Sequence, residues 1–219
     1  MTTLAPDRRL RRLRRKFVPG TTGWSVDDLD DPAVEALWNR GRYEIVEGVL
    51  TLMPPPAMYD GSLALKRLVR TFDDYAIGAG MGDGFAFEVD IILGKLRLPV
   101  VDACFLTPQE QEAQKRAHAA QKKKAKRNLK YGRILVPPTL IIESLSKGHE
   151  SHDRETKRRW YAEARVPNYW LLDADNRALE CLVLDGADYR VDQSGRDDAE
   201  LKPQAFPGLV IQLAKLWVV

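Results

Sequence analysis

The sequence predicts an α/β fold, and three observations support this prediction. The first is the order of elements between Ile134 and Asp173, where an apolar strand, a polar loop, a helical segment and a second apolar strand follow one another. The second is that apolar strands elsewhere in the chain come in pairs around turn residues. The third is length, because 219 residues suffice for one domain with its own hydrophobic core.

The first part of the chain predicts a short helix, a hairpin and a longer helix. A helix is expected within 24–40, where Ser25 precedes two aspartates and an apolar stripe. Two short strands are expected within 43–53, around a turn at Gly48. Apolar residues at helical spacing predict an amphipathic helix at 62–75.

The middle part predicts two strands between a loop and a polar helix. The glycine-rich segment 78–84 lacks the spacing of a phosphate-binding motif and follows no predicted strand, so it indicates no nucleotide site. Apolar strands are expected at 85–93 and 96–106. Residues 109–131 have high helix propensity but a thin apolar face, which is typical of a helix that projects from the body or lies on its surface.

The last part predicts further strands and a packed tail. Residues 139–145 are expected to form the first strand between Ile134 and Asp173, and Pro167 is expected to end the helix that follows it. A hairpin is expected between 178–184 and 189–192. The tail is expected to pack on the body through five apolar residues, Phe206, Leu209, Ile211, Leu213 and Trp217.

Charge is divided unevenly along the chain. Of the net charge of +3, residues 1–16 contribute +6 and residues 110–133 contribute +7, so the remainder carries −10. This partition suits a polyanionic partner held by basic appendages, with a cation-binding site in the acidic body. It is equally typical of two solvated surface segments. Residues 1–20 are expected to form a disordered basic arm that contacts nucleic acid or a membrane surface.

Several classes of protein are excluded by composition. The sequence lacks an apolar run of the roughly 18 residues that a membrane span needs, and its basic N-terminus lacks the apolar region of a secretory signal. Cys104 and Cys181 do not have the spacing of a metal site, and Cys104 is expected in the core. These features predict a cytoplasmic protein without a membrane span.

Two acidic residues interrupt strands that are otherwise apolar. These are Asp102 and Glu143, and a buried carboxylate is unfavourable by several kcal/mol unless a cation pairs with it. If the two strands are neighbours, both carboxylates can bind one hard cation such as Mg²⁺, with water and phosphate completing its shell. Lys157 is another candidate cation for a buried carboxylate. It shares a helix face with Asp153 and Tyr161, at i, i+4 spacing. A structural salt bridge is the commoner explanation of each acid taken alone.

The histidines are expected mainly at solvated positions and the tryptophans in the core. His149 and His152 flank the loop before the helix, where most histidines are solvated; contact with a substrate phosphate, or action as a base, is the alternative. His118 on the basic helix is less suited to catalysis still. Trp160 and Trp170 are expected in the core.

Five blocks of the sequence form a recognisable set. They are YEIVEGVL at 43–50 followed by MPPP, LPVVD at 98–102, PPTLIIESLS at 137–146, HDRETKRRWYAEARVPNYWLLD at 152–173, and FPGLVIQL at 206–213. Together they resemble the PD-(D/E)XK nuclease superfamily and, more closely, its bacterial Uma family of restriction endonucleases.

The resemblance implies a restriction-endonuclease-like fold, in which a mixed central β-sheet is flanked by helices. Residues 21–219 would form a single domain, and the basic segment at 108–133 would be a helical insertion between the two acid-bearing strands. Three positions depart from the family pattern without removing a predicted site residue: Asp60, Val101 and Lys147.

The resemblance also implies a site. Asp102 and Glu143 would bind the metal, and Lys157 would act as the catalytic lysine, because Leu145 occupies the position where the superfamily usually has it. Glu44 matches a further acid of the family and is expected as an additional catalytic residue or ligand. The implied activity is Mg²⁺-dependent cleavage of DNA by an endonuclease, with Mn²⁺ able to replace Mg²⁺.

The expected partner is DNA, and two rival functions remain open. The basic segments 8–16 and 115–133 would contact DNA, and a homodimer would supply the two sites that duplex cleavage needs. One rival is a catalytically silent nucleic-acid-binding or regulatory protein on the same fold. The other is a protein whose basic segments contact a membrane or an acidic protein.

Overall fold

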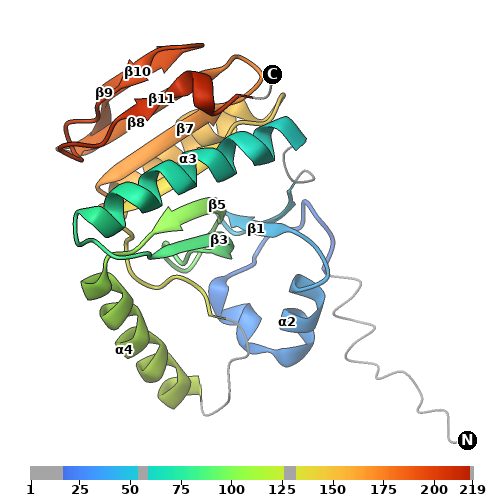
Figure 1. The fold of residues 1–219 in the computed structure, drawn as a ribbon. Coiled ribbons are helices and arrows are strands. Elements are labelled where there is room, and N and C mark those ends of the chain that lie inside the picture. Colours follow the sequence, from blue (N-terminus) through green and yellow to red (C-terminus); the bar gives the residue numbers. More distant parts are fainter. Residues whose placement is uncertain (1–16, 54–58, 126–131, 218–219) are drawn as a thin grey trace, which may run out of the picture.

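The computed structural model describes residues 17–53, 59–125 and 132–217, and its largest sheet has six strands in the order β3-β5-β6-β7-β8-β9 (Figure 1). Only β6 and β7 run parallel, so the sheet is mixed. Its strands are β3 (Phe85–Asp90), β5 (Val100–Phe105), β6 (Leu140–Ser144), β7 (Asn168–Asp173), β8 (Ala178–Asp185) and β9 (Asp188–Arg196). The predicted α/β class with a mixed central sheet is therefore confirmed. Most of the arm expected at 1–20 lies outside the described residues.

Helices cover both faces of this sheet. The long helix α3 (Tyr59–Gly78) crosses one face, where its residues Leu68 and Phe72 are fully buried (Figure 1). The other face packs against α5 (Arg158–Glu163), which is preceded by the π-helical segment η2 (His152–Lys157). The connection through η2 and α5 joins β6 to β7, because parallel neighbours need a long crossover.

The helix expected around Asp153, Lys157 and Tyr161 is present, but the expectation of a regular α-helix is wrong at its start. Residues 152–157 are π-helical, between α-helical residues at 150–151 and the α-helix α5. The predicted shared face is confirmed, because Lys157 and Tyr161 both contact Glu143 and Lys157 also pairs with Asp153. Single π-helical turns within α-helices are frequent at functional sites.

The hairpin predicted within 43–53 is confirmed. Its strands are β1 (Tyr43–Val46) and β2 (Val49–Leu52), paired in antiparallel register. Glu47 and Gly48 form the turn with positive φ angles of 48° and 79°. Two consecutive residues with positive φ match the right-handed twist of the strands, which explains the glycine at the second position.

The strand expected at 96–106 is wrong in one respect. Pro99 divides it into β4 (Arg97–Leu98), which pairs with β1, and β5, which joins the large sheet. Proline has no backbone N–H to donate to a continuous ladder, so the chain changes sheets there. The strand expected at 85–93 is also shorter and ends at Asp90, whose carbonyl accepts a hydrogen bond from the segment that follows α4 (Pro108–Ala125).

The helix expected within 24–40 is two helices. They are the 3₁₀-helix η1 (Val26–Asp30) and α2 (Pro32–Trp38). Asp31 between them has an extended backbone, with φ −79° and ψ 118°. A residue that precedes proline is disfavoured in the helical region, which explains the break. The carboxylate of Asp31 then accepts a hydrogen bond of 2.9 Å from the backbone N–H of Ala33 and caps α2.

Replacing Asp31 by alanine should lower the free energy of unfolding by about 1 kcal/mol, because the cap satisfies a backbone donor of the first turn. Urea denaturation followed by tryptophan fluorescence measures this difference. The exposed Asp198, replaced by alanine in parallel, should leave the midpoint unchanged. An Asp31→Ala protein as stable as the wild type would show that the cap is not needed.

Two apolar clusters hold the sheet between its helices. On the α3 side the ring of Phe72 makes edge contacts with five other rings, those of Tyr75, Phe85, Phe105, Trp170 and Phe206. All five tail residues expected to pack are buried in this cluster. The expected burial of Cys104, Trp160 and Trp170 is also confirmed.

The C-terminal hairpin is confirmed and longer than expected. Strands β8 and β9 pair as far as Asp185 and Asp188, with a two-residue turn between them. The remaining elements are short: β10 (Glu200–Leu201), β11 (Ile211–Gln212) and the 3₁₀-helix η3 (Leu213–Lys215). No helix in the described ranges has the length and apolar character needed to cross a bilayer.

The polar helix α4 extends away from the rest of the molecule (Figure 1). Its first half is anchored, because Glu110 accepts a hydrogen bond from Thr139 and Gln114 contacts the backbone of Arg133. The Nε2 atom of His118 also lies 2.8 Å from the carbonyl oxygen of Arg133, so this histidine has a structural contact. Four basic residues on α4 are exposed: Lys115, Arg116, Lys122 and Lys123. The residues of the basic segment at 126–131 lie outside the described ranges.

Candidate active site

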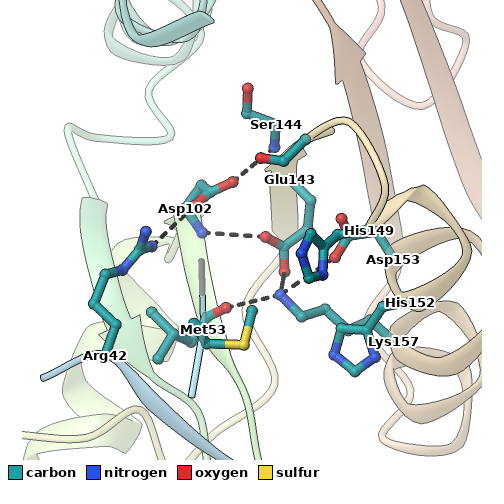
Figure 2. A pocket seen from close by; sticks show the side chains of 11 residues that line it. Arg42, Met53, Asp102, Glu143, Ser144, His149, His152, Asp153 and Lys157 are labelled. Atoms are coloured by element: carbon teal, nitrogen blue, oxygen red, sulfur yellow. Dashed lines mark hydrogen bonds and ion pairs between the residues drawn. The ribbon is translucent and has the colours of Figure 1, made fainter. Parts of the chain in front are cut away.

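Asp102 and Glu143 lie side by side, as expected for acids on neighbouring strands. Strands β5 and β6 pair in antiparallel register next to these residues. The backbone N–H of Asp102 donates to Glu143 Oε2 at 3.4 Å, and the backbone N–H of Ser144 donates to Asp102 Oδ2 at 2.8 Å. Both carboxylates line one pocket, with Asp102 on one side and Glu143 on the other (Figure 2).

Lys157 is the cation that the buried Glu143 requires. Its ammonium donates to Glu143 Oε1 and to the carbonyl of Val100, each at 3.0 Å (Figure 2). It also lies 3.3 Å from Glu44 Oε1 and 3.4 Å from Asp153 Oδ1. Only 3% of its side chain is exposed. One ammonium is therefore shared among three carboxylates and a backbone carbonyl, which is more oxygen partners than its three N–H donors can satisfy fully.

Glu44 supports Lys157 and does not line the pocket beside Asp102 and Glu143. It is fully buried, and its Oε1 accepts a hydrogen bond of 2.9 Å from the backbone N–H of Val100 in addition to the Lys157 contact. Its Oε2 lies 3.0 Å from Nε2 of His152. Both oxygens are thus engaged by groups of the protein, which favours a positioning role over direct binding of a metal.

The hydrogen bonds of Glu143 orient it toward the pocket. Its Oε1 accepts from Lys157 and, at 2.6 Å, from the hydroxyl of Tyr161. Its Oε2 has the longer contact with the backbone of Asp102. A second hydroxyl, that of Tyr169, donates to the carbonyl of Asp153 and holds η2 against β7. The carboxylate is therefore fixed through one oxygen, and the other faces Asp102.

The electrostatic environment shifts the pKa values of Glu143 and Lys157, each for a different reason. Burial, with the neighbouring Asp102 and Asp153 carboxylates, raises the pKa of Glu143 well above its ordinary value, although Lys157 opposes this. Burial alone would lower the pKa of Lys157, but Glu143, Glu44 and Asp153 raise it well above its usual range. Lys157 is therefore an ammonium at neutral pH, so it supplies positive charge and does not accept a proton.

The pKa of Glu44 shows how strongly this cluster depends on its cations. Burial would raise that pKa, but Lys157 and His152 reverse the effect and hold it below the ordinary value. The pKa of Asp153 is raised by burial in spite of the same two neighbours. The cluster thus contains more carboxylates than one ammonium neutralises well, and a further cation would be favourable there.

Two residues that contact Asp102 in the pocket were not predicted from the sequence. Arg42 Nη2 lies 3.5 Å from Asp102 Oδ1, and Ser144 holds the other oxygen of Asp102 through its backbone. The sequence contains no pattern that marks either of them. His149 and His152 both line the pocket, and His152 also contacts Glu44, so the expectation of solvated loop histidines is wrong for His152.

The pocket fits a cation with oxygen ligands, although the described residues contain no group of three His, Cys, Asp or Glu side chains arranged to hold a metal ion. Mg²⁺ is typically bound through one or two carboxylates, with water and phosphate completing its shell. Asp102 and Glu143 provide two carboxylates at one point. Burial, and then its acidic neighbours, raise the pKa of Glu143, which indicates that Lys157 does not fully compensate the negative charge there.

Comparison with known proteins identifies a family and a similar solved structure. The model of the Uma2 family, described as "Putative restriction endonuclease", matches residues 33–214. A solved structure titled as that of "a putative nuclease belonging to DUF820" from Anabaena variabilis ATCC 29413 aligns with a TM-score of 0.56 and 16% sequence identity, covering 80% of this chain and 88% of the other. At this identity the structural likeness shows a shared fold. No curated protein sequence matches the chain.

Proposed function

The chain belongs to the Uma2 family, and from this premise we propose that it is a Mg²⁺-dependent DNA endonuclease of the PD-(D/E)XK type. The observation that carries the proposal is the meeting of Asp102 and Glu143 in one pocket beside the Lys157 ammonium. Two carboxylates and a lysine are the parts that metal-dependent phosphodiester hydrolysis uses.

Asp102 and Glu143 would hold the cation through the oxygens that face the pocket. When bound, Mg²⁺ supplies a water of lowered pKa and neutralises charge on the scissile phosphate, and Mn²⁺ can do the same. Lys157 keeps Glu143 Oε1 in place and adds positive charge beside the site. Glu44 acts through Lys157 and His152, so we assign it as a positioning residue.

The basic segments would hold the DNA backbone. Lys115 and Arg116 on α4, together with Lys122 and Lys123, present exposed positive charge on a helix that extends from an otherwise acidic body. Such charge attracts phosphates without regard to sequence. The basic segments 8–16 and 115–133 are the parts of the sequence that we propose contact DNA. Cleavage of both strands of a duplex would require two sites, and hence a homodimer.

The proposal predicts cleavage that depends on metal. Purified full-length protein should nick or linearise circular DNA in Mg²⁺ or Mn²⁺ and should leave it intact in EDTA, because two carboxylates alone cannot activate water. Gel electrophoresis of supercoiled plasmid, circular single-stranded DNA and RNA measures both activity and substrate class. Cleavage of no substrate in either metal, together with binding that weakens steeply with salt, would support the silent nucleic-acid-binding protein instead.

A further inference from the structure

A second pocket opens on the other side of Asp102. It lies between α3 and β3, which is the edge strand of the large sheet. Its volume is about 350 Å³, at the low end of the range of roughly 300–1,000 Å³ that small-molecule pockets occupy. Asp102 and Ser144 line both this pocket and the carboxylate pocket. The two pockets therefore adjoin at these two residues.

The walls of the second pocket combine apolar surface with one unsatisfied polar group. Leu65 and Val69 of α3 line one side, and Phe87 of β3 lines the other. One face of the Phe87 ring is stacked on Phe85, with centroids 6.0 Å apart, but the side chain is 52% exposed, which leaves ring surface for a ligand to contact. Ser144 is only 6% exposed, and its Oγ has no hydrogen-bond partner among the described residues. A buried hydroxyl without a protein partner is rare, so this one is available to a hydrogen-bonding group that enters the pocket.

The charges around this pocket limit the chemistry of a ligand that could bind there. Lys66 is exposed at the rim and suits a phosphate. The carboxylates of Glu88 and Asp102 also line the pocket and disfavour an anion inside it. The ligand should therefore have a planar, uncharged part with polar edges, attached to a backbone that carries phosphates. A nucleobase within a strand has this chemistry.

We infer that the second pocket receives one nucleobase, unstacked from its neighbours, of the strand whose phosphate lies at Asp102. The base would stack on Phe87 and form a hydrogen bond with Ser144 Oγ through its edge. This inference rests on the proposed function, because it places the scissile phosphate at the carboxylates. A base inside a duplex is stacked on both sides and cannot enter such a pocket without being extruded. The preferred substrate class is therefore single-stranded or locally unpaired nucleic acid.

The test compares binding to strands with and without bases. Full-length wild type and Phe87→Ala are titrated in EDTA against a labelled oligothymidylate of about 12 nucleotides, within the roughly 4–16 nucleotides that single-strand-binding folds cover. Phe87→Ala should weaken binding roughly tenfold, the effect expected for one base–aromatic stack. An abasic strand of equal length should bind both proteins equally, because it has phosphates and no bases. Ser144→Ala should weaken only the base-bearing strand, by a few-fold.

The control and the outcomes separate this inference from the proposed function. Ile77→Ala removes an apolar side chain of α3 that is 59% exposed and lies outside the pocket. This variant should bind as the wild type does. Equal weakening by Phe87→Ala on both strands, or equal binding of both strands by the wild type, would overturn the base pocket. Metal-dependent cleavage would still stand in that case, since EDTA binding does not measure it. Dissociation of a dimer by Phe87→Ala in sedimentation would also overturn the inference, by showing that a second copy fills the pocket.

Discussion

Replacing Lys157 by methionine should lower the free energy of unfolding by about 3–5 kcal/mol. The ammonium is almost fully buried and lies within 3.0–3.4 Å of oxygens of Glu143, Glu44 and Asp153. Methionine fills a similar length of chain, so the loss comes from carboxylates that remain buried without their cation and not from a cavity. Urea denaturation, monitored by tryptophan fluorescence and far-ultraviolet circular dichroism, measures the change.

Two further variants isolate the electrostatic cause. Lys115→Met removes an ion pair with Glu112 whose two side chains are 70% and 58% exposed, and it should change stability by less than about 1 kcal/mol. The double variant Glu143→Gln/Lys157→Met should be more stable than Lys157→Met alone, because it removes one of the uncompensated carboxylates. If Lys157→Met unfolds at the same urea concentration as the wild type, the cluster does not depend on its ammonium.

Replacing Asp102 by asparagine should lower the rate of Mg²⁺-dependent cleavage by about 1,000-fold or more while the fold is kept. The asparagine oxygen can still accept the hydrogen bond from the backbone of Ser144, so the strand pairing remains. The contact with Arg42 is a single ion pair of 3.5 Å to the other oxygen of Asp102, so its loss leaves the hydrogen bond from Ser144 in place. The change therefore removes the charge that a cation needs without removing structure.

Initial cleavage rates and urea midpoints of the same preparations test this prediction. Glu143→Gln should lose cleavage to a similar extent, although its stability should also change because Lys157 loses a partner. Asp198→Asn provides a control on an exposed surface. Cleavage that survives in both Asp102→Asn and Glu143→Gln would exclude these carboxylates from the reaction and would falsify the proposed site.

The local elements could be predicted because their causes are local. The hairpin at 43–53 follows from a glycine turn between apolar strands, and the crossover after Glu143 follows from a polar loop, a helix face and Pro167. The errors have local causes as well, and they occur where one residue outweighs a pattern. Pro32 breaks the first helix and Pro99 divides a strand, although the apolar pattern continues through both.

The α/β class, the family-like motifs and the identity of the two acids could be predicted without coordinates, because a carboxylate in an apolar strand is easily recognised. The surroundings of the two acids could be described only from the folded chain. The tertiary structure placed Glu44 and His152 beside Lys157, Arg42 beside Asp102, and Phe87 across a second pocket. These contacts join elements that are distant along the chain. Their distances depend on strand order, register and helix packing, which local periodicity does not encode.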